Sequence, residues 1–221
     1  MKIWPLAEHF ISINGEGQKA GMIAAFLRMK GCNLRCNYCD TAWANTPDCP
    51  VNPLSTQEII QWLEKHHIQL VTLTGGEPLL VPDIDSLIVD LGQAGFSVEI
   101  ETNGSVSLAP FHQLSPRPAF TLDYKCPDSG MESFMCTENF SLLTRQDTVK
   151  FVVSSLSDLD KAKEITETYD LSSRCSILLS AVFGRIEPRE IVEYMLRKHW
   201  NDARLQLQMH KFIWSPTQQG V

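Results

Sequence analysis

Gly31-Cys32-Asn33-Leu34-Arg35-Cys36-Asn37-Tyr38-Cys39-Asp40 is the stretch of this chain that decides its fold. Its three cysteines, with three and then two residues between them, differ from the paired C-x2-C units of structural zinc sites. A four-iron cubane has one ligand for each iron, normally four thiolates. Three thiolates leave one iron open to bind and activate a small molecule. The spacing therefore favours a catalytic [4Fe-4S] cluster held by Cys32, Cys36 and Cys39.

Two other interpretations of the cysteines stay open at this point. A zinc site could recruit one of the six histidines as its fourth ligand. The three cysteines could also be free thiols, because free cysteine packs well in protein cores.

A second motif, Leu73-Thr74-Gly75-Gly76-Glu77-Pro78, follows the cysteine run. The two glycines can adopt backbone angles closed to other residues and can present bare amides to a ligand. Glu77 offers an acceptor for an ammonium group. The alternative is an ordinary turn after a strand, which Gly-Gly and Pro often mark.

Length and composition limit the class of protein. The 221 residues fit one domain, residues 1–221, and the formal charge of −7 argues against nucleic acid as a partner. No apolar run approaches a membrane span, and the first five residues do not resemble a signal peptide. Seven cysteines without secretory features indicate free thiols in a reducing cytoplasm. Those outside the cluster run are isolated and are not expected to bind it: Cys49, Cys126, Cys136 and Cys175.

Apolar runs typical of buried parallel strands alternate with helical patterns along the chain. Six strands are predicted, at residues 24–29, 69–73, 96–100, 120–123, 149–153 and 176–180. Ser55-Thr56-Gln57-Glu58 resembles a capping box before a helix that contains Ile59, Ile60 and Leu63. Residues 157–168 and 187–198 have helical spacing as well.

Repeated β-α units with right-handed crossovers predict a curled parallel sheet whose functional residues gather at the carboxyl ends of the strands. The selected motifs all follow predicted strands: the cysteine run, Gly75 to Pro78, Glu101 to Gly104, Asp123 to Lys125, and Ser180. We therefore expect one composite site. Residues 42–54, rich in Asn and Pro, are expected to cover it as a loop.

The C-x3-C-x2-C run and the glycine motif together resemble the radical S-adenosylmethionine (SAM) superfamily. The resemblance implies that SAM chelates the open iron, and that one electron cleaves SAM to methionine and a 5′-deoxyadenosyl radical. It also implies an open, partial (β/α)6-type barrel, here with trimmed helices.

Within the superfamily, the chain resembles the 7-carboxy-7-deazaguanine synthases. The resemblance is carried by Phe10 to Gly17, Cys39-Asp40-Thr41, Glu101 to Gly104, and Arg204 to Trp214. It implies a carbon–nitrogen lyase that converts 6-carboxy-5,6,7,8-tetrahydropterin to 7-carboxy-7-deazaguanine and ammonia, in the biosynthesis of queuosine and other 7-deazapurines. Magnesium, a homodimer and a reducing partner such as flavodoxin are implied too.

The resemblance also assigns roles to residues. Those implied to bind SAM are Gly76, Glu77, Thr102, Asn103, Asp123, Tyr124, Lys125, Ser180, Ala181, Val182 and Phe183. Those implied to bind the substrate are Ile13, Asn14, Gly15, Glu16, Arg28, Thr74 and Val221, and Thr41 matches the magnesium position. The chain departs from the pattern at Ile13-Asn14, where many relatives carry Leu-Gln, and at Asp123-Tyr124, where relatives often carry Ser-Pro.

Some of these roles agree with side-chain chemistry. Arg28 can hold a carboxylate with a forked pair of hydrogen bonds. Glu16 can accept from the guanidine-like edge of a pterin. His210 is either a site residue or a satisfied histidine near the core.

Two rival functions remain. A glycyl-radical activating enzyme can share this style of cysteine loop, and a non-catalytic zinc-binding module could use the same thiols. The Gly15-Glu16-Gly17 segment and the ending from Gln208 to Trp214 favour the pterin enzyme over the first rival.

Overall fold

Six parallel strands form the centre of the computed structural model, which describes residues 2–215 and 218–221. The predicted strands are confirmed, with ends that differ by one or two residues in most cases. They are β2 (Ile23–Met29), β4 (Leu70–Gly75), β5 (Ser97–Thr102), β6 (Ala119–Tyr124), β7 (Thr148–Val153) and β8 (Ser176–Ala181). Each pairs in parallel with the next. Met1, Pro216 and Thr217, which belong to the predicted single domain, lie outside the described residues.

Three further strands were not predicted. β1 (Ile3–Ile13) pairs antiparallel with β2, β3 (Asn52–Ser55) pairs antiparallel with β1, and β9 (Ala203–Leu205) lies beside β8. The prediction of one loop over residues 42–54 was therefore wrong at its end. Pro53 hid this strand from sequence reasoning, but proline is tolerated on an edge strand such as β3.

The helices pack outside the sheet. The helices are α1 (Thr56–Lys65), α2 (Ile84–Gln93), α3 (Ala109–His112), α4 (Leu156–Thr168), α5 (Pro188–Arg197) and α6 (His210–Ile213). The capping box predicted at Ser55 is present: the Glu58 amide donates to the Ser55 hydroxyl at 3.3 Å, and the Ser55 amide donates to the Glu58 carboxylate at 2.8 Å. A four-residue α3 joins β5 to β6, and only 3-10 turns join β6 to β7, so the expected trimming of the helices is confirmed. No helix among residues 2–215 and 218–221 is long and apolar enough to cross a membrane.

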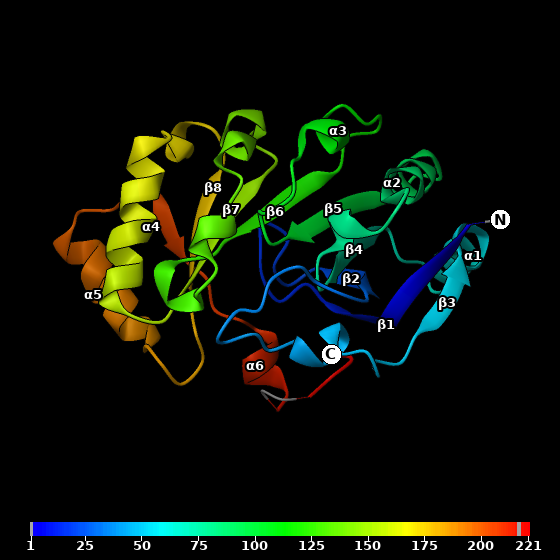
Figure 1. Cartoon of the computed structure of the whole chain (residues 1–221), viewed down its shortest axis with the longest axis horizontal. Helices are drawn as coiled ribbons and strands as arrows, with labels where there is room; N and C mark the ends of the chain where they lie inside the picture. The colour runs from blue at the N-terminus through cyan, green and yellow to red at the C-terminus, as the bar shows by residue number, and fades with distance from the viewer. Residues whose placement is uncertain (1, 216–217) are drawn as a thin grey trace.

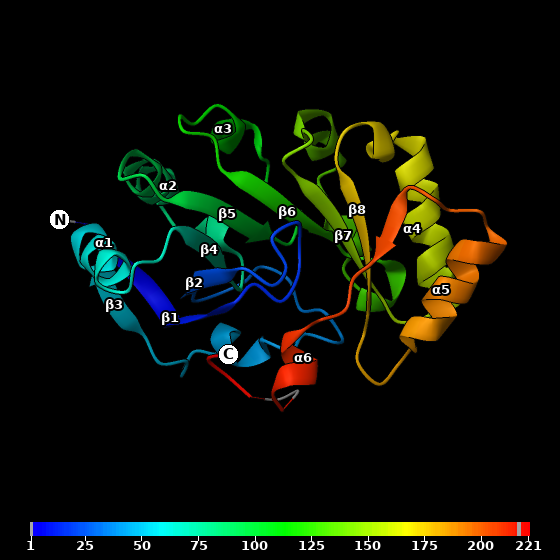
Figure 2. The same ribbon diagram turned by 180° about the vertical axis from the view of Figure 1, so that it is seen from behind.

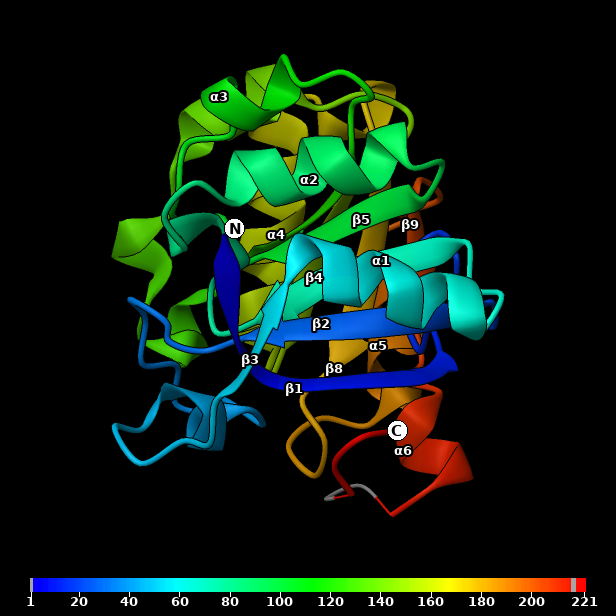
Figure 3. The same ribbon diagram turned by 90° about the vertical axis from the view of Figure 1, so that its right-hand side faces the viewer.

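The sheet curls without closing, in the strand order β3-β1-β2-β4-β5-β6-β7-β8-β9. Figures 1 and 2 show α2, α4 and α5 on the outer side of the curl, and α6 with the C-terminus at its open side. Figure 3 shows α1 and α2 side by side over the outer face. The expected open, partial barrel of the (β/α)6 type is confirmed.

Alternation along the strands separates the core from the concave face. On β7, Val149, Phe151 and Val153 join the apolar core beneath the helices, whereas Lys150 and Val152 face the inside of the curl. The other core strands alternate in the same way. The interior of the curl is therefore polar, and it is there that the predicted site residues collect.

Candidate active site

A cavity of about 720 Å³ lies at the carboxyl edge of the strands. Most of the predicted site residues line it together: Ile13, Asn14, Gly15, Glu16, Arg28, Cys32, Cys36, Cys39, Thr41, Thr74, Gly76, Thr102, Asn103, Asp123, Lys125, Val182, Phe183 and Val221. His210 lines it too. The structure thus brings residues from both ends of the chain to one place.

The cysteine loop leaves β2 at Gly31, whose φ of +92° suits glycine. Backbone and side-chain donors surround its first sulfur: the Leu34 amide lies 3.4 Å and Asn103 Nδ2 3.5 Å from Cys32 Sγ. Burial raises the pKa of the Cys36 and Cys39 thiols.

The donor set suits an iron–sulfur cluster. Three thiols line one cavity, and N–H groups that point at a sulfur stabilise its negative charge. In the described part of the chain, no three His, Cys, Asp or Glu side chains converge closely enough to hold a single metal ion. A cubane binds each thiolate through a different iron, so its ligands need not meet at one point.

The glycine turn has a different role from the one predicted. The Gly76 amide donates to Met29 O at 3.2 Å, so it is not bare, and a Cβ at Gly76 would lie 1.9 Å from Gly31 O. The prediction of free amides was wrong at Gly76. Glycine is needed there because the end of β4 passes against the start of the cysteine loop.

Glu77 was predicted to accept from an ammonium group, but its carboxylate is fully buried and engaged within the chain. Its Oε1 accepts from Thr102 Oγ1 at 2.9 Å, and its Oε2 accepts from the Asn103 amide at 2.6 Å. Burial raises the pKa of Glu77 to about 7 despite these bonds. Glu77 therefore links the turn after β4 to the end of β5, and a direct contact with a ligand is not supported.

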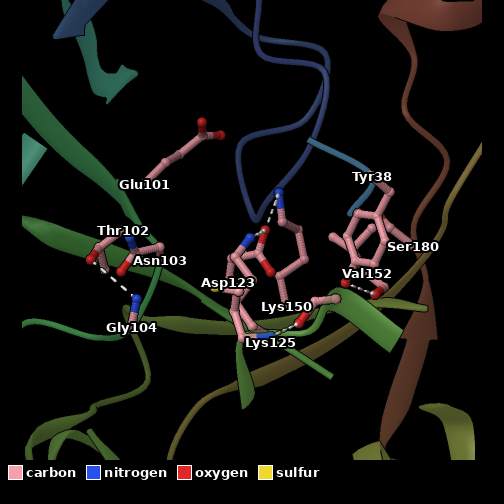
Figure 4. A network of polar contacts seen from close by, with 12 residues as sticks. Tyr38, Glu101, Thr102, Asn103, Gly104, Asp123, Lys125, Lys150, Val152 and Ser180 are labelled. Atoms are coloured by element: carbon pink, nitrogen blue, oxygen red, sulfur yellow. Dashed lines mark hydrogen bonds and ion pairs between the residues drawn. The ribbon is translucent and has the colours of Figure 1, made fainter. Parts of the chain in front are cut away.

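A chain of charges crosses the floor of the cavity (Figure 4). Lys150 Nζ lies 3.0 Å from Glu16 Oε2 and 3.8 Å from Asp123 Oδ2. Lys125 Nζ lies 2.9 Å from Asp123 Oδ2, and the Ser180 hydroxyl donates to Glu16 Oε1 at 3.0 Å. The network joins the segment after β1 to β6, β7 and β8.

The ionisation of the network follows from its pairing. Burial by itself lowers the pKa of Lys150, but the carboxylates of Glu16 and Asp123 more than offset this, and the pKa lies well above its usual range. Burial raises the pKa of Glu16, but the charge and hydrogen bond of Lys150, together with His210 and the Ser180 hydroxyl, hold this pKa below its usual value. Asp123 Oδ1 has no hydrogen-bond partner among the described residues. One acceptor in the network is therefore unused by the protein.

The side of the cavity formed by β1, β2 and β4 carries further pairs. Arg28 Nε lies 2.6 Å from Glu8 Oε1, and the Thr74 hydroxyl donates to Glu101 Oε2 at 2.7 Å. Thr41 Oγ1 donates to Asp40 Oδ1 at 3.0 Å. Arg28 is held by a carboxylate of its own chain, so it is positioned before any ligand arrives.

Three other predicted residues do not line the cavity. Tyr124 packs with the outer core and donates its hydroxyl to Glu132 at 3.0 Å, because its side chain points to the opposite face of β6 from Asp123. Ser180 is buried and reaches the site only through Glu16, and Ala181 packs against the core. Side-chain contacts of these three with SAM are not supported.

Several residues that line the cavity received no role from the sequence. They are Glu8, Trp43, Asn45, Glu101, Lys150 and Arg185. Lys150 offered a signal, since a lysine in the middle of an apolar strand must find a carboxylate or a cavity. Cys126 is fully buried and lies 3.8 Å from Asp158 O, so it belongs to the core. The His210 ring lies against Gly15, and burial lowers the pKa of His210.

Comparison with known proteins agrees with the geometry. The Radical SAM superfamily matches residues 26–116. A 7-carboxy-7-deazaguanine synthase from Clostridium acetobutylicum is 49% identical over 219 residues, which cover 99% of each chain. The enzyme of the same name from Chlorobaculum tepidum is 36% identical and covers 98% of this chain and 96% of its own.

The fold has a solved counterpart. The crystal structure of QueE from Escherichia coli matches with a TM-score of 0.74 at 22% identity, covering 94% of this chain and 95% of that one. With similarity over its whole length, the chain belongs to the 7-carboxy-7-deazaguanine synthase family of radical SAM enzymes.

Proposed function

We propose that this chain converts 6-carboxy-5,6,7,8-tetrahydropterin to 7-carboxy-7-deazaguanine with release of ammonia, in the biosynthesis of queuosine and related 7-deazapurines. The observation that carries the proposal is one cavity that gathers three cysteines, the turn after β4 and a floor of paired charges. The full-length relatives support the same activity.

Membership of the family implies a [4Fe-4S] cluster and SAM, which when bound supply the one-electron chemistry that removes hydrogen from a substrate. Cys32, Cys36 and Cys39 would hold the cluster. Thr102, Asn103, Asp123 and Lys125 stand where they can hold SAM, and the carboxylate of Asp123 retains a free acceptor for it. Gly76 and Glu77 would fix the shape of that wall.

The remaining residues suit the substrate. Arg28 would meet its carboxylate, since a guanidinium binds a carboxylate through paired donors. Glu16, held ionised by Lys150, would accept from N–H groups of the pterin. Ile13, Gly15, Thr74 and Val221 would complete the wall around the ring. Val182 and Phe183 would cover the opening.

Magnesium belongs to the proposal through Thr41. The Thr41 hydroxyl donates its hydrogen to Asp40, so its lone pairs remain available to a cation. One hydroxyl is too weak a site by itself, because Mg²⁺ prefers six oxygens. Substrate oxygens and water would therefore supply the other ligands.

The setting of the enzyme is part of the proposal as well. All seven cysteines are free, which suits a reducing cytoplasm. We infer a single functional domain, a homodimer as in the resemblance described above, and a reductant such as flavodoxin that delivers the electron.

The test is anaerobic turnover with SAM, a reductant and 6-carboxytetrahydropterin, with product detected by mass spectrometry. The proposal predicts 7-carboxy-7-deazaguanine and ammonia in equal amounts, with SAM regenerated rather than consumed. A brown protein that turns over a glycine-containing peptide instead would support an activating enzyme. A colourless zinc protein would contradict both.

A further inference from the structure

Behind the residues that line the cavity lies a buried carboxylate that none of the roles above uses. Glu99, on β5, is 4% exposed and does not line the cavity. The Thr121 hydroxyl donates to its Oε1 at 2.8 Å, and Asn14 Nδ2 donates to its Oε2 at 3.2 Å. A carboxylate placed among neutral partners at this depth is costly, so its position calls for a reason.

Asn14 gives that reason. The residue is 1% exposed and lines the cavity, yet its Oδ1 has no hydrogen-bond partner among the described residues. Leaving a buried acceptor without a partner is unfavourable, because the group loses its bond to water and gains none in return. A ligand that carries an N–H group could supply the missing donor.

The orientation of the Asn14 amide depends on Glu99. The Asn14 backbone is held on both sides, since its N–H donates to Met22 O and its carbonyl accepts from Gly21 N, each at 2.7 Å. Only the side-chain amide can turn. Glu99 Oε2 accepts from the NH2 end of this amide, so the carbonyl end is directed away from Glu99, even though burial raises the pKa of Glu99.

The surrounding backbone leaves room for this arrangement. Gly17 has a φ of +79°, and a Cβ there would lie 3.1 Å from Glu99 Oε1. A side chain at Gly17 would therefore require the Glu99 carboxylate to shift by a few tenths of an ångström. The turn after β1 packs closely against Glu99.

We propose that Glu99 is a positioning residue that holds the Asn14 amide so that Oδ1 accepts an N–H of the bound pterin. Glu99 makes no contact with the substrate itself and acts through Asn14. The proposal rests on the proposed function, since it takes the pterin as the ligand. Many relatives carry glutamine at the position of Asn14. In this chain, Glu99 would orient the shorter asparagine amide toward the cavity.

The experiment is a double-mutant cycle of Asn14→Ala, Glu99→Gln and the double variant, on the cluster-loaded enzyme. Glu99→Gln can turn either end of its amide toward Asn14, so the orientation is lost. We expect the KM for 6-carboxytetrahydropterin to rise about tenfold in each single variant, and the double variant to be no worse than Asn14→Ala, with kcat changed much less. Pterin affinity from anaerobic calorimetry should change in parallel.

A merely structural role for Glu99 would give other results. It would lower iron content and SAM affinity together with pterin affinity, and either change in Glu99→Gln contradicts the proposal. So does an unchanged KM, or a double variant whose defect is the product of the two single defects. Asp158→Asn is the matched control: Asp158 is fully buried outside the cavity and accepts from the Ser154 amide at 2.9 Å. It should lower the melting temperature and leave the KM unchanged.

Two further measurements keep the outcome clear. If Glu99→Gln does not fold, Thr121→Val loosens the other oxygen of Glu99 and takes its place in the same cycle, with a smaller defect expected in the same direction. If the parent enzyme binds the pterin without converting it, the proposed function is wrong. The double-mutant cycle would then still test the role of Glu99 through the pterin affinities. A parent enzyme that does not bind it would remove both.

Discussion

Two aspartates at opposite ends of the central strands show how this molecule separates stability from function. Asp147, just before β7, is fully buried: its Oδ1 accepts from Arg117 Nη1 and the Phe120 amide, and its Oδ2 accepts from Arg117 Nη2 and the Thr144 amide, all at 2.6–3.0 Å. Asp123, near the end of β6, pairs with lysines through Oδ2 and leaves Oδ1 without a partner among the described residues.

The two aspartates, one at the amino edge and one at the carboxyl edge of the sheet, differ in how many of their hydrogen-bond acceptors the protein leaves unused. At the amino ends, every acceptor of the buried aspartate is used by the protein itself, which holds the loops together. At the carboxyl end of β6, Asp123 Oδ1 is positioned but unused among the described residues, and a ligand can complete it. Variants at the two edges should therefore fail in different ways.

The largest difference is expected from Cys36→Ala, which should abolish iron loading and turnover together. Two thiolates cannot hold a cubane that also binds SAM, so iron should fall from about four per chain to background. The loss lies at the functional edge, and the circular dichroism of the chain should stay that of a folded protein. Iron analysis and turnover measure the effect.

Cys49→Ala is the matched control for that variant. Cys49 is buried in a small cluster with Ala7 and Ala44 and does not line the cavity. It should keep both iron and activity. An essential Cys49, or an active Cys36→Ala enzyme, would overturn the assignment of the ligands.

Asp147→Ala should destabilise the protein by about 3–5 kcal/mol, because it leaves Arg117 and the amides of Phe120 and Thr144 without their acceptor. Urea unfolding measures this loss. The folded fraction should keep the parent KM. Asp123→Ala should also cost stability, because the buried Lys125 loses its carboxylate, but unlike Asp147→Ala it should weaken SAM binding in the folded enzyme. An unchanged SAM affinity in Asp123→Ala would break the comparison.

Lys150→Met should destabilise the protein by about 3 kcal/mol at pH 8, since Glu16 would be buried without its cation. In the parent, the pKa of Glu16 lies below its usual value, so its contribution to stability is lost only as the pH falls through that lowered pKa. In the variant, burial raises the pKa of Glu16, and stability is then lost as the pH rises through it.

The loss in Lys150→Met should therefore be larger at pH 8 than at pH 5.5, which denaturant unfolding at the two values checks. Lys163→Met serves as the control, because its partner Glu167 is exposed on α4. A defect that does not depend on pH would mean that Glu16 stays ionised without Lys150.

A C-terminal extension should weaken substrate binding without preventing SAM cleavage. Val221 and Gly220 line the cavity, so residues added after Val221 would crowd the substrate. We expect about a tenfold rise in the KM for the pterin, equivalent to about 1.4 kcal/mol. The same tag at the amino end is the control, and an unchanged KM in the C-terminally tagged enzyme would count against a role for Val221.

The smallest effect is expected from Thr41→Val, which should reduce magnesium stimulation by about threefold and leave the cluster and SAM binding intact. Magnesium binding should be measurable only with substrate present, because the hydroxyl supplies a single ligand. Thr46→Val is a suitable control, since the Thr46 hydroxyl donates to Trp43 O outside the proposed metal position. If Thr41→Val responds to magnesium like the parent, Thr41 is not a magnesium ligand and its hydroxyl only bonds Asp40.

Local patterns predicted much of the fold. The apolar runs located all six central strands, and the Ser55–Glu58 pattern located the start of α1, because both depend on a few neighbouring residues. β1 and β3 were missed. Their pairing depends on segments about 50 residues apart, with Ile3 opposite Ser55, and no local pattern reports such a partner.

The same limit explains the predictions at Glu77 and Tyr124. Each lies in a motif at the correct strand end, but the motif does not say toward which partner the side chain turns. Tyr124 alternates away from Asp123 on β6, and Glu77 is bound by the end of β5.

The sequence by itself determined the chemistry of this protein: three closely spaced thiols, a glycine turn after a strand, and a series of apolar runs that each end in a polar motif. These features are local, because ligand spacing and strand periodicity are written in consecutive residues. Only the tertiary structure decided which polar groups are satisfied and which are left for a ligand. Lys150 meets Glu16 across 134 positions and Asn14 meets Glu99 across 85, and such partners are chosen by the packing of the whole sheet.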